Sequence, residues 1–206
     1  FNWNNSSRNI KLEWLVDVEQ IGSRTKAGVE CGVDGETVPA GRCANQLSGG
    51  KRAFKSMAGS GGAGIRDLDT SNLDSFEQMF NRANEFDQNL SGWNTANVTT
   101  IAYMFQEAEK FTNGGDPDIN NWDTGKVTEM NYAFDRAVSF NHDLSGWNTS
   151  EVTTMSSMFY GASSFNGSVS SWNTSKATKM KSMFQSAAAF NHDLSHFDVA
   201  LVTDMS

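Results

Sequence analysis

Residues 147–171 read WNTSEVTTMSSMFYGASSFNGSVSS, and residues 172–196 read WNTSKATKMKSMFQSAAAFNHDLSH. The two stretches have the same length and share their tryptophan, methionine and phenylalanine positions. Self-similarity at a fixed period is typical of repeat architectures, in which each unit buries its apolar side only against its neighbours. The sequence therefore predicts a repeat protein.

The 25-residue pattern extends along most of the chain. An insertion within residues 112–119, TNGGDPDI, lengthens one copy by four residues, and its glycines and proline favour a loop. We predict a non-repeat amino-terminal cap, residues 1–64, because a bare end repeat exposes its core. The array, residues 65–206, then holds about five and a half repeats and is truncated at its carboxyl-terminal end. Its copies begin at Leu68, Trp93, Trp122, Trp147, Trp172 and Phe197.

Each repeat contains two segments with different apolar spacing. In residues 152–162, VTTMSSMFYGA, the apolar positions are separated by three, three, one and three, which fits one face of a short helix. In residues 144–150, LSGWNTS, the spacing of Leu144, Trp147 and Thr149 is that of the short strand of leucine-rich repeats. The predicted fold class is an α/β repeat solenoid, leucine-rich-repeat-like, with one short parallel strand and one short helix per repeat.

Stacked repeats would bring equivalent residues into rows along the array. We expect both the methionine row and the phenylalanine row to lie in the core, and the tryptophans to lie in register. These rows are Met130, Met155 and Met180; Phe105, Phe134, Phe159 and Phe184; and Trp122, Trp147 and Trp172.

The consensus W-N/D-T-S-x-V-T-x-M-x-x-M-F-x-x-A-x-x-F-N-x-D-L-S-x closely resembles the BspA-like family of leucine-rich-repeat surface proteins, of the 25-residue type. The resemblance covers about residues 65–206. It implies a secreted or surface-anchored protein that serves adhesion and recognition. It carries no direct information about residues 1–64.

The charge distribution excludes some partners. Residues 1–64 carry eight Lys/Arg and six Asp/Glu, whereas residues 65–206 carry eight Lys/Arg and eighteen Asp/Glu. An acidic array repels phosphate backbones, so we expect no nucleic-acid partner. No stretch approaches the ~18 consecutive apolar residues of a membrane span, so we expect no span in this segment.

The amino-terminal segment holds the only cysteines, Cys31 and Cys43. Their separation is not the CxxC spacing of zinc or thioredoxin-type sites, and a local disulfide is favoured over two free thiols. A disulfide would imply an oxidising compartment. Gly59, Gly61 and Gly64 form a formal GxGxxG, but no strand-to-helix context is apparent, which favours a flexible connection over a nucleotide site.

The sequence offers no convincing catalytic set. His142 and His192 share a repeat position that other copies fill with glutamine or glycine, which indicates tolerance rather than chemistry. Asp143 and Asp193 are two repeats apart, too far for a paired-carboxylate mechanism. No Ser/His/Asp or Cys/His nucleophile arrangement can be assembled. We therefore predict no enzyme activity, no cofactor and no metal.

The candidate binding strip is the outward residue that follows the aromatic residue opening each repeat. The simpler reading, which we favour, is that these side chains hydrogen-bond turns and neighbouring repeats. The functional reading is a shallow surface for a protein or a glycan, weak per repeat and strengthened by copies. The strip is Asn94, Asp123, Asn148, Asn173 and Asp198; possible N-glycosylation sequons begin at Asn4, Asn5, Asn89, Asn97, Asn148, Asn166 and Asn173.

We expect an extracellular or cell-surface module for protein interaction and adhesion, whose partner is a protein or glycan on a surface. The alternative is a structural subunit of a filament or larger assembly that docks through its open solenoid end, where Val202 and Met205 would be exposed. Ice binding is disfavoured, because its candidate residues occupy an inward position of the strand motif. They are Thr95, Thr124, Thr149 and Thr174.

Overall fold

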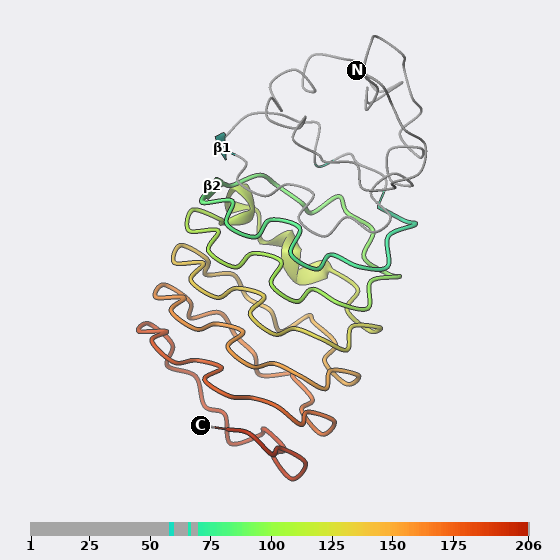
Figure 1. The fold of residues 1–206 in the computed structure, drawn as a ribbon, viewed down its shortest axis with the longest axis vertical. Coiled ribbons are helices and arrows are strands. Elements are labelled where there is room, and N and C mark those ends of the chain that lie inside the picture. Colours follow the sequence, from blue (N-terminus) through green and yellow to red (C-terminus); the bar gives the residue numbers. More distant parts are fainter. Residues whose placement is uncertain (1–57, 60–65, 67–69, 206) are drawn as a thin grey trace, which may run out of the picture.

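The computed structural model describes residues 58–59, 66 and 70–205. Most of the predicted cap therefore lies outside the described residues, together with Cys31, Cys43 and the sequons at Asn4 and Asn5. Figure 1 shows the described chain as similar coils, each lying against the next. Regular elements in this part are two short strands and two 3-10 helices: β1 (Ala58–Gly59), β2 (Glu85–Phe86), η1 (Asn113–Gly115) and η2 (Pro117–Asn121).

Successive repeats pair with one another in parallel. Strand β1 pairs with β2, with Ala58 opposite Glu85. At a different position of the repeat, isolated parallel bridges join each copy to the next. The period read from the sequence is therefore also a period in space. The bridged residues are Ser75, Thr100, Glu129, Thr154, Lys179 and Asp204.

The segment predicted to be helical, residues 152–162, is instead a series of tight turns bonded to the next repeat. Alternate N–H groups donate to carbonyls of the following repeat, as Phe159 does to Met183 at 2.9 Å. The N–H groups between them bond three residues back, as Met158 does to Met155 at 3.2 Å. An α-helix would bond every N–H to the carbonyl four residues earlier. The prediction of one helix per repeat is wrong: no α-helix occurs in the described residues.

Backbone geometry explains the difference. Ser157 has φ 54° and Gly161 has φ 66°, both in the left-handed region, whereas a helix needs φ near −63° throughout. Apolar residues three apart fit successive three-residue turns as well as they fit a helix. A left-handed backbone costs roughly 1–2 kcal/mol per non-glycine residue, which the inter-repeat hydrogen bonds offset. Such residues are Gln78, Arg82, Tyr103, Glu107, Asn113, Tyr132, Arg136, Ser157, Ser182 and Ser186.

The predicted strand is also misplaced. Residues 144–150 form turns, in which Trp147 N–H donates to the Leu144 carbonyl at 3.0 Å and Val152 N–H donates to the Thr149 carbonyl at 3.0 Å. Parallel pairing between repeats exists, but it runs through the turn segment beside Thr154. The leucine-rich-repeat spacing therefore predicted correctly which side chains point inward. It predicted the wrong segment for the parallel pairing between repeats.

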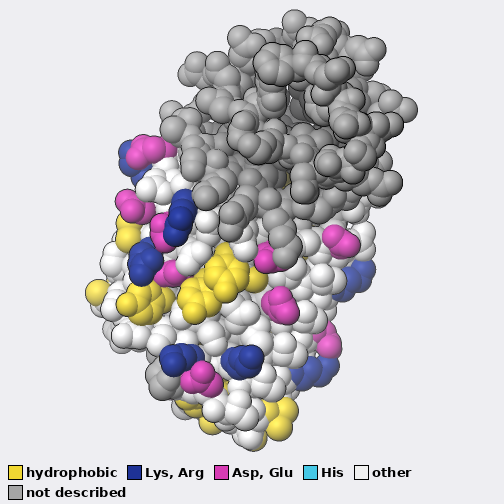
Figure 2. Space-filling model, in the orientation of Figure 1, with side chains coloured by type: hydrophobic (Ala, Val, Ile, Leu, Met, Phe, Trp, Pro, Cys, Tyr) yellow, Lys and Arg dark blue, Asp and Glu magenta, His cyan; other side chains and the backbone are white. Residues whose placement is uncertain are grey.

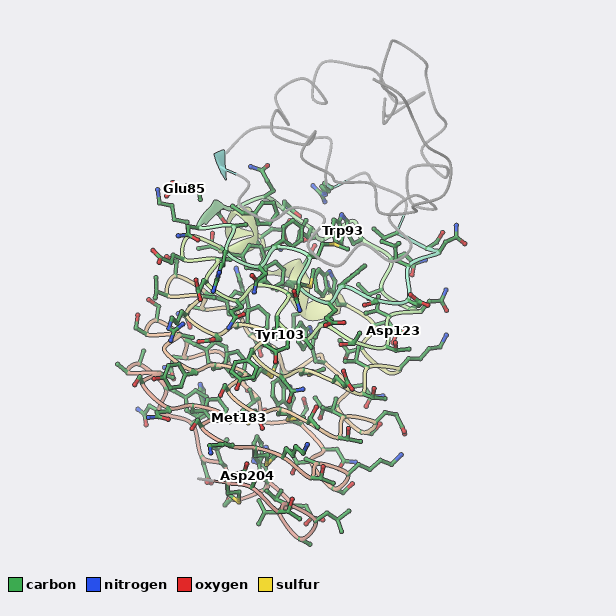
Figure 3. The ribbon with its side chains drawn as sticks, in the orientation of Figure 1. Glu85, Trp93, Tyr103, Asp123, Met183 and Asp204 are labelled. Carbon is green, nitrogen blue, oxygen red and sulfur yellow. The ribbon has the colours of Figure 1, made fainter. Side chains whose placement is uncertain are left out.

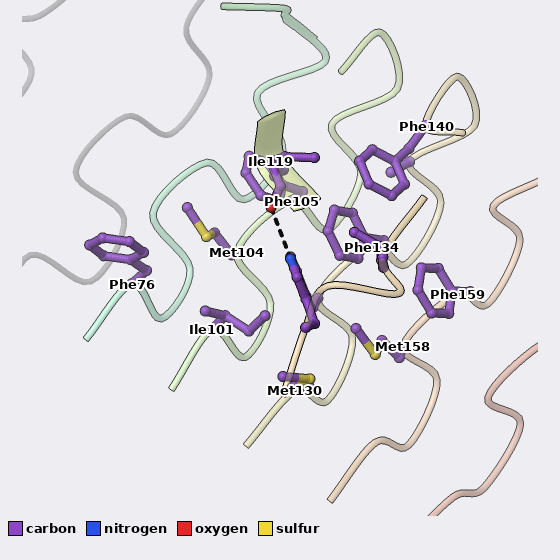
Figure 4. Packing of buried hydrophobic residues seen from close by; sticks show 14 of the residues in the cluster. Phe76, Ile101, Met104, Phe105, Ile119, Met130, Phe134, Phe140, Met158 and Phe159 are labelled. Carbon is purple, nitrogen blue, oxygen red and sulfur yellow. Dashed lines mark hydrogen bonds between the residues drawn. The ribbon is translucent and has the colours of Figure 1, made fainter. Parts of the chain in front are cut away.

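The interior is a continuous cluster of aromatic and methionine side chains. Phe134 lies between Phe105 and Phe159, with ring centroids at 5.4 and 5.5 Å, and it packs on Phe140 of its own repeat at 4.1 Å. Figure 4 shows these rings side by side with Met104, Met130 and Met158. The predicted methionine row is buried, and the phenylalanine row is buried as far as Phe159, with Phe184 partly buried.

The tryptophans lie in register, as predicted. The rings of Trp122 and Trp147 are stacked, with centroids 6.2 Å apart and planes 6° apart. Two of these indole N–H groups donate to a carbonyl 28 residues earlier in the chain: Trp147 to Ile119 at 2.9 Å (the dashed line in Figure 4) and Trp172 to Leu144 at 2.9 Å. A buried indole thus keeps its polar group satisfied.

The insertion at residues 112–119 is ordered rather than a plain loop, because it folds into η1 and η2. Asn113 is fully buried, and its Oδ1 accepts the Leu90 N–H at 2.7 Å. Asp87 Oδ1 accepts the N–H groups of Thr112 (2.6 Å) and Gly114 (3.0 Å). The extra residues are therefore tied to the preceding repeat.

The inward threonines are buried and join neighbouring repeats, as their expected position requires. The Thr149 hydroxyl donates to the Asn173 carbonyl at 3.0 Å and accepts the Asn173 N–H at 2.9 Å. Thr124 and Thr174 donate in the same way to the repeats that follow them.

We expect Thr149→Val to lower the free energy of unfolding by about 1–3 kcal/mol, because it removes the buried hydroxyl that pairs with both the carbonyl and the N–H of Asn173 in partly buried bonds. Thr153→Val is the matched control. Its hydroxyl bond to the Thr128 carbonyl is exposed, so water can replace it. Urea unfolding followed by tryptophan fluorescence measures both; equal losses would contradict the assignment.

Candidate functional site

The predicted binding strip, which we call the corner strip, is exposed, but the Oδ1 atom of each of its side chains already accepts a hydrogen bond. Asn148 Oδ1 accepts the Ser150 N–H at 3.0 Å, and Asp123 Oδ1 accepts the Gly125 N–H at 3.0 Å. The same bond, to the N–H two residues on, is made by Asn94, Asn173 and Asp198. Each side chain therefore holds a turn at the edge of a repeat. Partner binding by this strip stays a prediction.

The described sequons differ in how far their amide nitrogens are engaged. Asn89 Nδ2 donates to Asp116, and Asn97 Nδ2 donates to the Ser71 carbonyl at 2.9 Å. Among the described residues, the side-chain nitrogens of Asn148, Asn166 and Asn173 make no such bond, and these three residues are exposed. The fold thus leaves these three more accessible to modification than Asn89 and Asn97.

The histidines contact neighbouring repeats. His142 Nε2 lies 2.5 Å from the Thr112 carbonyl, and His192 Nε2 lies 2.8 Å from that of Asn166. Asp193 caps a turn, and the backbone N–H and hydroxyl of Ser195 lower the pKa of its carboxyl. Within the described ranges, no group of three or more His, Cys, Asp and Glu could hold a metal ion.

A second face carries aromatic side chains that the sequence reasoning did not single out. Tyr103 and Tyr132 stack on the outside of adjacent repeats, with ring centroids 4.8 Å apart, and both are half-buried. Tyr160 lies in the next repeat, and the Arg136 guanidinium lies over its ring, 5.6 Å from the ring centroid. Figure 3 places Tyr103 in the middle of this face and Asp123, of the corner strip, at its edge. We call Tyr103, Tyr132, Tyr160 and Arg136 the tyrosine face.

Charged and polar rows flank the tyrosine face. Glu107 pairs with Arg82 at 3.2 Å and with Arg136 at 3.4 Å, which joins three successive repeats. These pairs are largely exposed, so each contributes little to stability. Burial and the neighbouring Tyr132 raise the pKa of the Tyr103 hydroxyl, which stays protonated at neutral pH. Figure 2 shows hydrophobic side chains in the middle of this face with charged ones around them.

Asp135 ends a row of side-chain hydrogen bonds beneath the tyrosine face. Asn81 Nδ2 donates to Gln106 Oε1 at 2.7 Å, and Gln106 Nε2 donates to Asp135 Oδ2 at 2.7 Å. Asp135 Oδ1 is buried and has no hydrogen-bond partner. Burial, above all, raises the pKa of this carboxyl, although the bond from Gln106 and the charge of Arg136 oppose the shift.

We expect Asp135→Asn to raise the free energy of unfolding at neutral pH, by about 1 kcal/mol, because it removes a buried charge. In the native protein, protonation of Asp135 adds stability that is fully present below the ordinary pKa of 3.8 and is lost as pH rises through the raised folded pKa. The advantage of the variant should therefore shrink as pH falls. Thermal unfolding of both proteins between neutral pH and pH 3.8 tests this prediction. A stability gain of the variant that does not change with pH would contradict the effect of burial on Asp135.

The tyrosine face had a sequence signal that went unused. All three tyrosines of the chain fall within consecutive repeats, just beside the core positions Met104, Ala133 and Phe159. A residue type confined to one side of the apolar run indicates a surface feature. The Asp135 oxygen that lacks a hydrogen bond had no such signal, because its burial depends on the backbone turns.

These observations define a class: a repeat protein whose copies share one aromatic core and carry polar side chains on their edges. Two overlapping stretches, residues 51–153 and 113–206, match the family described as Mycoplasma protein of unknown function, DUF285. The matches cover more than half of the chain, which therefore belongs to this family. They begin at residue 51, within the segment assigned to the cap.

A search of curated proteins and a search of solved structures each found no match. In the described part of the chain, no helix is long and apolar enough to cross a membrane.

Proposed function

We propose that the chain is an extracellular or cell-surface interaction module, serving adhesion, that binds a protein or a glycan and catalyses no reaction. Its array would be a solenoid related to the BspA-like leucine-rich-repeat surface proteins, without the helix. Inter-repeat hydrogen bonding and the shared aromatic core support this, because together they make a scaffold that can present side chains at fixed spacing.

The observation that carries the proposal is the tyrosine face. Tyrosine and arginine are enriched among residues that dominate binding energy at interfaces. Tyr132 and Tyr160 are half-exposed on successive repeats, and the Arg136 guanidinium lies over the Tyr160 ring. The corner strip offers only short amide and carboxylate groups whose Oδ1 atoms already hold turns. The tyrosine face is therefore the principal contact surface, and the corner strip adds weak contacts.

The test is binding of the purified chain to immobilised glycans and to purified extracellular-matrix proteins. The double variant Tyr132→Ala/Arg136→Ala should weaken binding by about tenfold or more. Asn148→Ala/Asn173→Ala, on the corner strip, is the matched control and should change it little. Circular dichroism confirms folding of both variants. Absence of binding to every probe, or binding that the tyrosine-face variant leaves intact, would contradict the proposal.

A structural subunit remains the second candidate, and one observation favours it. A shallow, mainly apolar hollow lies on the side of the array formed by its last described repeats, and its lining includes Met183, Phe184, Leu194, Phe197 and Met205. Another chain that presents a repeat of the same pattern could bury these side chains. Analytical ultracentrifugation would support this candidate if the chain associates with rising concentration and Met205→Glu abolishes association. A monomer at every concentration would contradict it.

A further inference from the structure

Two Asn-Gly dipeptides lie in the described part of the chain, Asn113–Gly114 and Asn166–Gly167, in contrasting surroundings. We propose that Asn166 is a site of spontaneous covalent modification, at which its side-chain amide is lost by deamidation, whereas Asn113 is protected. The inference does not depend on the function proposed above.

The reaction needs only water. The backbone nitrogen of Gly167 attacks Cγ of Asn166, a new C–N bond closes a five-membered succinimide, and the Cγ–Nδ2 bond breaks. Nδ2 leaves as ammonia, taking the proton of the Gly167 N–H. Water then opens the ring at either carbonyl and gives aspartate or isoaspartate. Glycine favours the attack because it has no Cβ to obstruct it and its backbone reaches more conformations.

The surroundings of Asn166 permit this attack. Asn166 is exposed, whereas Gly167 is buried against the backbone of His142. Within residues 70–205 neither the Asn166 Nδ2 nor the Gly167 N–H makes a hydrogen bond. Its Oδ1 accepts the Asn191 N–H at 3.0 Å. A donor in that position stabilises the negative charge that develops on this oxygen when the nitrogen attacks. The leaving group and the nucleophile are thus both unrestrained by hydrogen bonds.

Asn113 has the same sequence context and the opposite environment. It is fully buried, and its Nδ2 donates to Ser91 Oγ at 3.1 Å and to the Asp116 carbonyl at 2.7 Å. The nitrogen that would attack, Gly114 N–H, donates to Asp87 Oδ1 at 3.0 Å. Loss of its proton beside a carboxylate is unfavourable, because like charges would meet. Both the leaving group and the nucleophile are held.

The modification would act on the contact between repeats. Asn166 N–H donates to Asn141 Oδ1 at 2.7 Å, and the Asn166 carbonyl lies 2.8 Å from His192 Nε2. Isoaspartate lengthens the backbone by one atom at this point and adds a negative charge. The register between residues 141, 166 and 191 would then be broken locally.

The experiment incubates the full chain at mildly alkaline pH, digests it, and measures the two Asn-Gly peptides by mass spectrometry. A parallel sample in urea gives the intrinsic rate of each peptide. We expect the folded chain to convert Asn166 at least about tenfold faster than Asn113, relative to those intrinsic rates. Asn166→Gln should remove the product at this position. Equal protection of the two sites, or faster conversion of Asn113, would overturn the proposal.

Discussion

Replacement of Phe134 by alanine is expected to lower the free energy of unfolding by about 3–5 kcal/mol, the usual cost of removing a buried phenylalanine. The ring is fully buried, and it contacts Phe105, Phe159 and Phe140. The substitution removes the middle ring of a row, so the repeats on either side lose their shared contact. Because stability in such arrays comes from contacts between neighbours, the loss should be large.

Phe184→Ala is the matched control for this prediction. Phe184 belongs to the same row and stacks on Phe159 at 5.5 Å, but it is only partly buried. The same substitution should therefore cost clearly less. Urea unfolding followed by fluorescence of the tryptophans reports both values. Equal losses at the two positions would show that the row does not carry stability from repeat to repeat.

The second large effect is expected for Gly167→Ala. A Cβ at this position would lie 1.8 Å from the backbone oxygen of His142, in the preceding repeat, and 2.6 Å from its carbonyl carbon. Because both atoms belong to the backbone, a change of side-chain rotamer cannot relieve the clash, and the two repeats must separate. We expect a loss of about 3 kcal/mol, at the upper end of the usual cost of overpacking.

Gly125→Ala serves as the control for backbone effects. Its added Cβ would meet only side-chain atoms, Asp123 Oδ1 at 3.2 Å and Asn148 Nδ2 at 3.5 Å, and the equivalent position in other repeats carries serine or alanine. Thermal unfolding of both variants, at one protein concentration, separates them. A Gly167→Ala variant as stable as Gly125→Ala would mean that the repeats are not in the close contact described.

Much of the interior could be predicted from the sequence, because burial follows from the period alone. Once the copies are aligned, Met155, Phe159 and Trp147 must each occupy a row, and the structure places all three rows in the core. The inward position of Thr149 follows from the same alignment. These predictions depend only on which side chains contact one another. Because the copies stack at a fixed period, equivalent side chains of neighbouring repeats must be in contact.

The backbone between these side chains could not be predicted from the apolar pattern. Ser157 and Ser182 have left-handed backbones, although serine has no strong preference for that region. The conformation persists because alternate N–H groups bond to the adjacent repeat. Tertiary contacts therefore override the helical spacing. The insertion is similar: Asn113 is fixed by the Leu90 N–H, a partner that no local pattern reveals.

The candidate sites were predictable to different degrees. The exposure of Asn148 and Asn173 follows from their place beside an inward tryptophan. Their role in holding turns agrees with the simpler of the two readings. The tyrosine face could have been predicted by comparing, between repeats, the residues that lie outside the core. The contrast between Asn113 and Asn166 required the structure, because both have the same Asn-Gly sequence.

Each repeat is hydrogen-bonded to the next through the turn segment, and the arrangement of the whole array depends on this bonding. Scalar coupling through hydrogen bonds, measured by NMR on the labelled chain, tests it directly. The amide nitrogen of Phe134 should couple to the carbonyl carbon of Met158, and that of Phe159 to the carbonyl carbon of Met183. Coupling of Phe134 to the carbonyl carbon of Met130 instead, as a helix requires, would contradict the account.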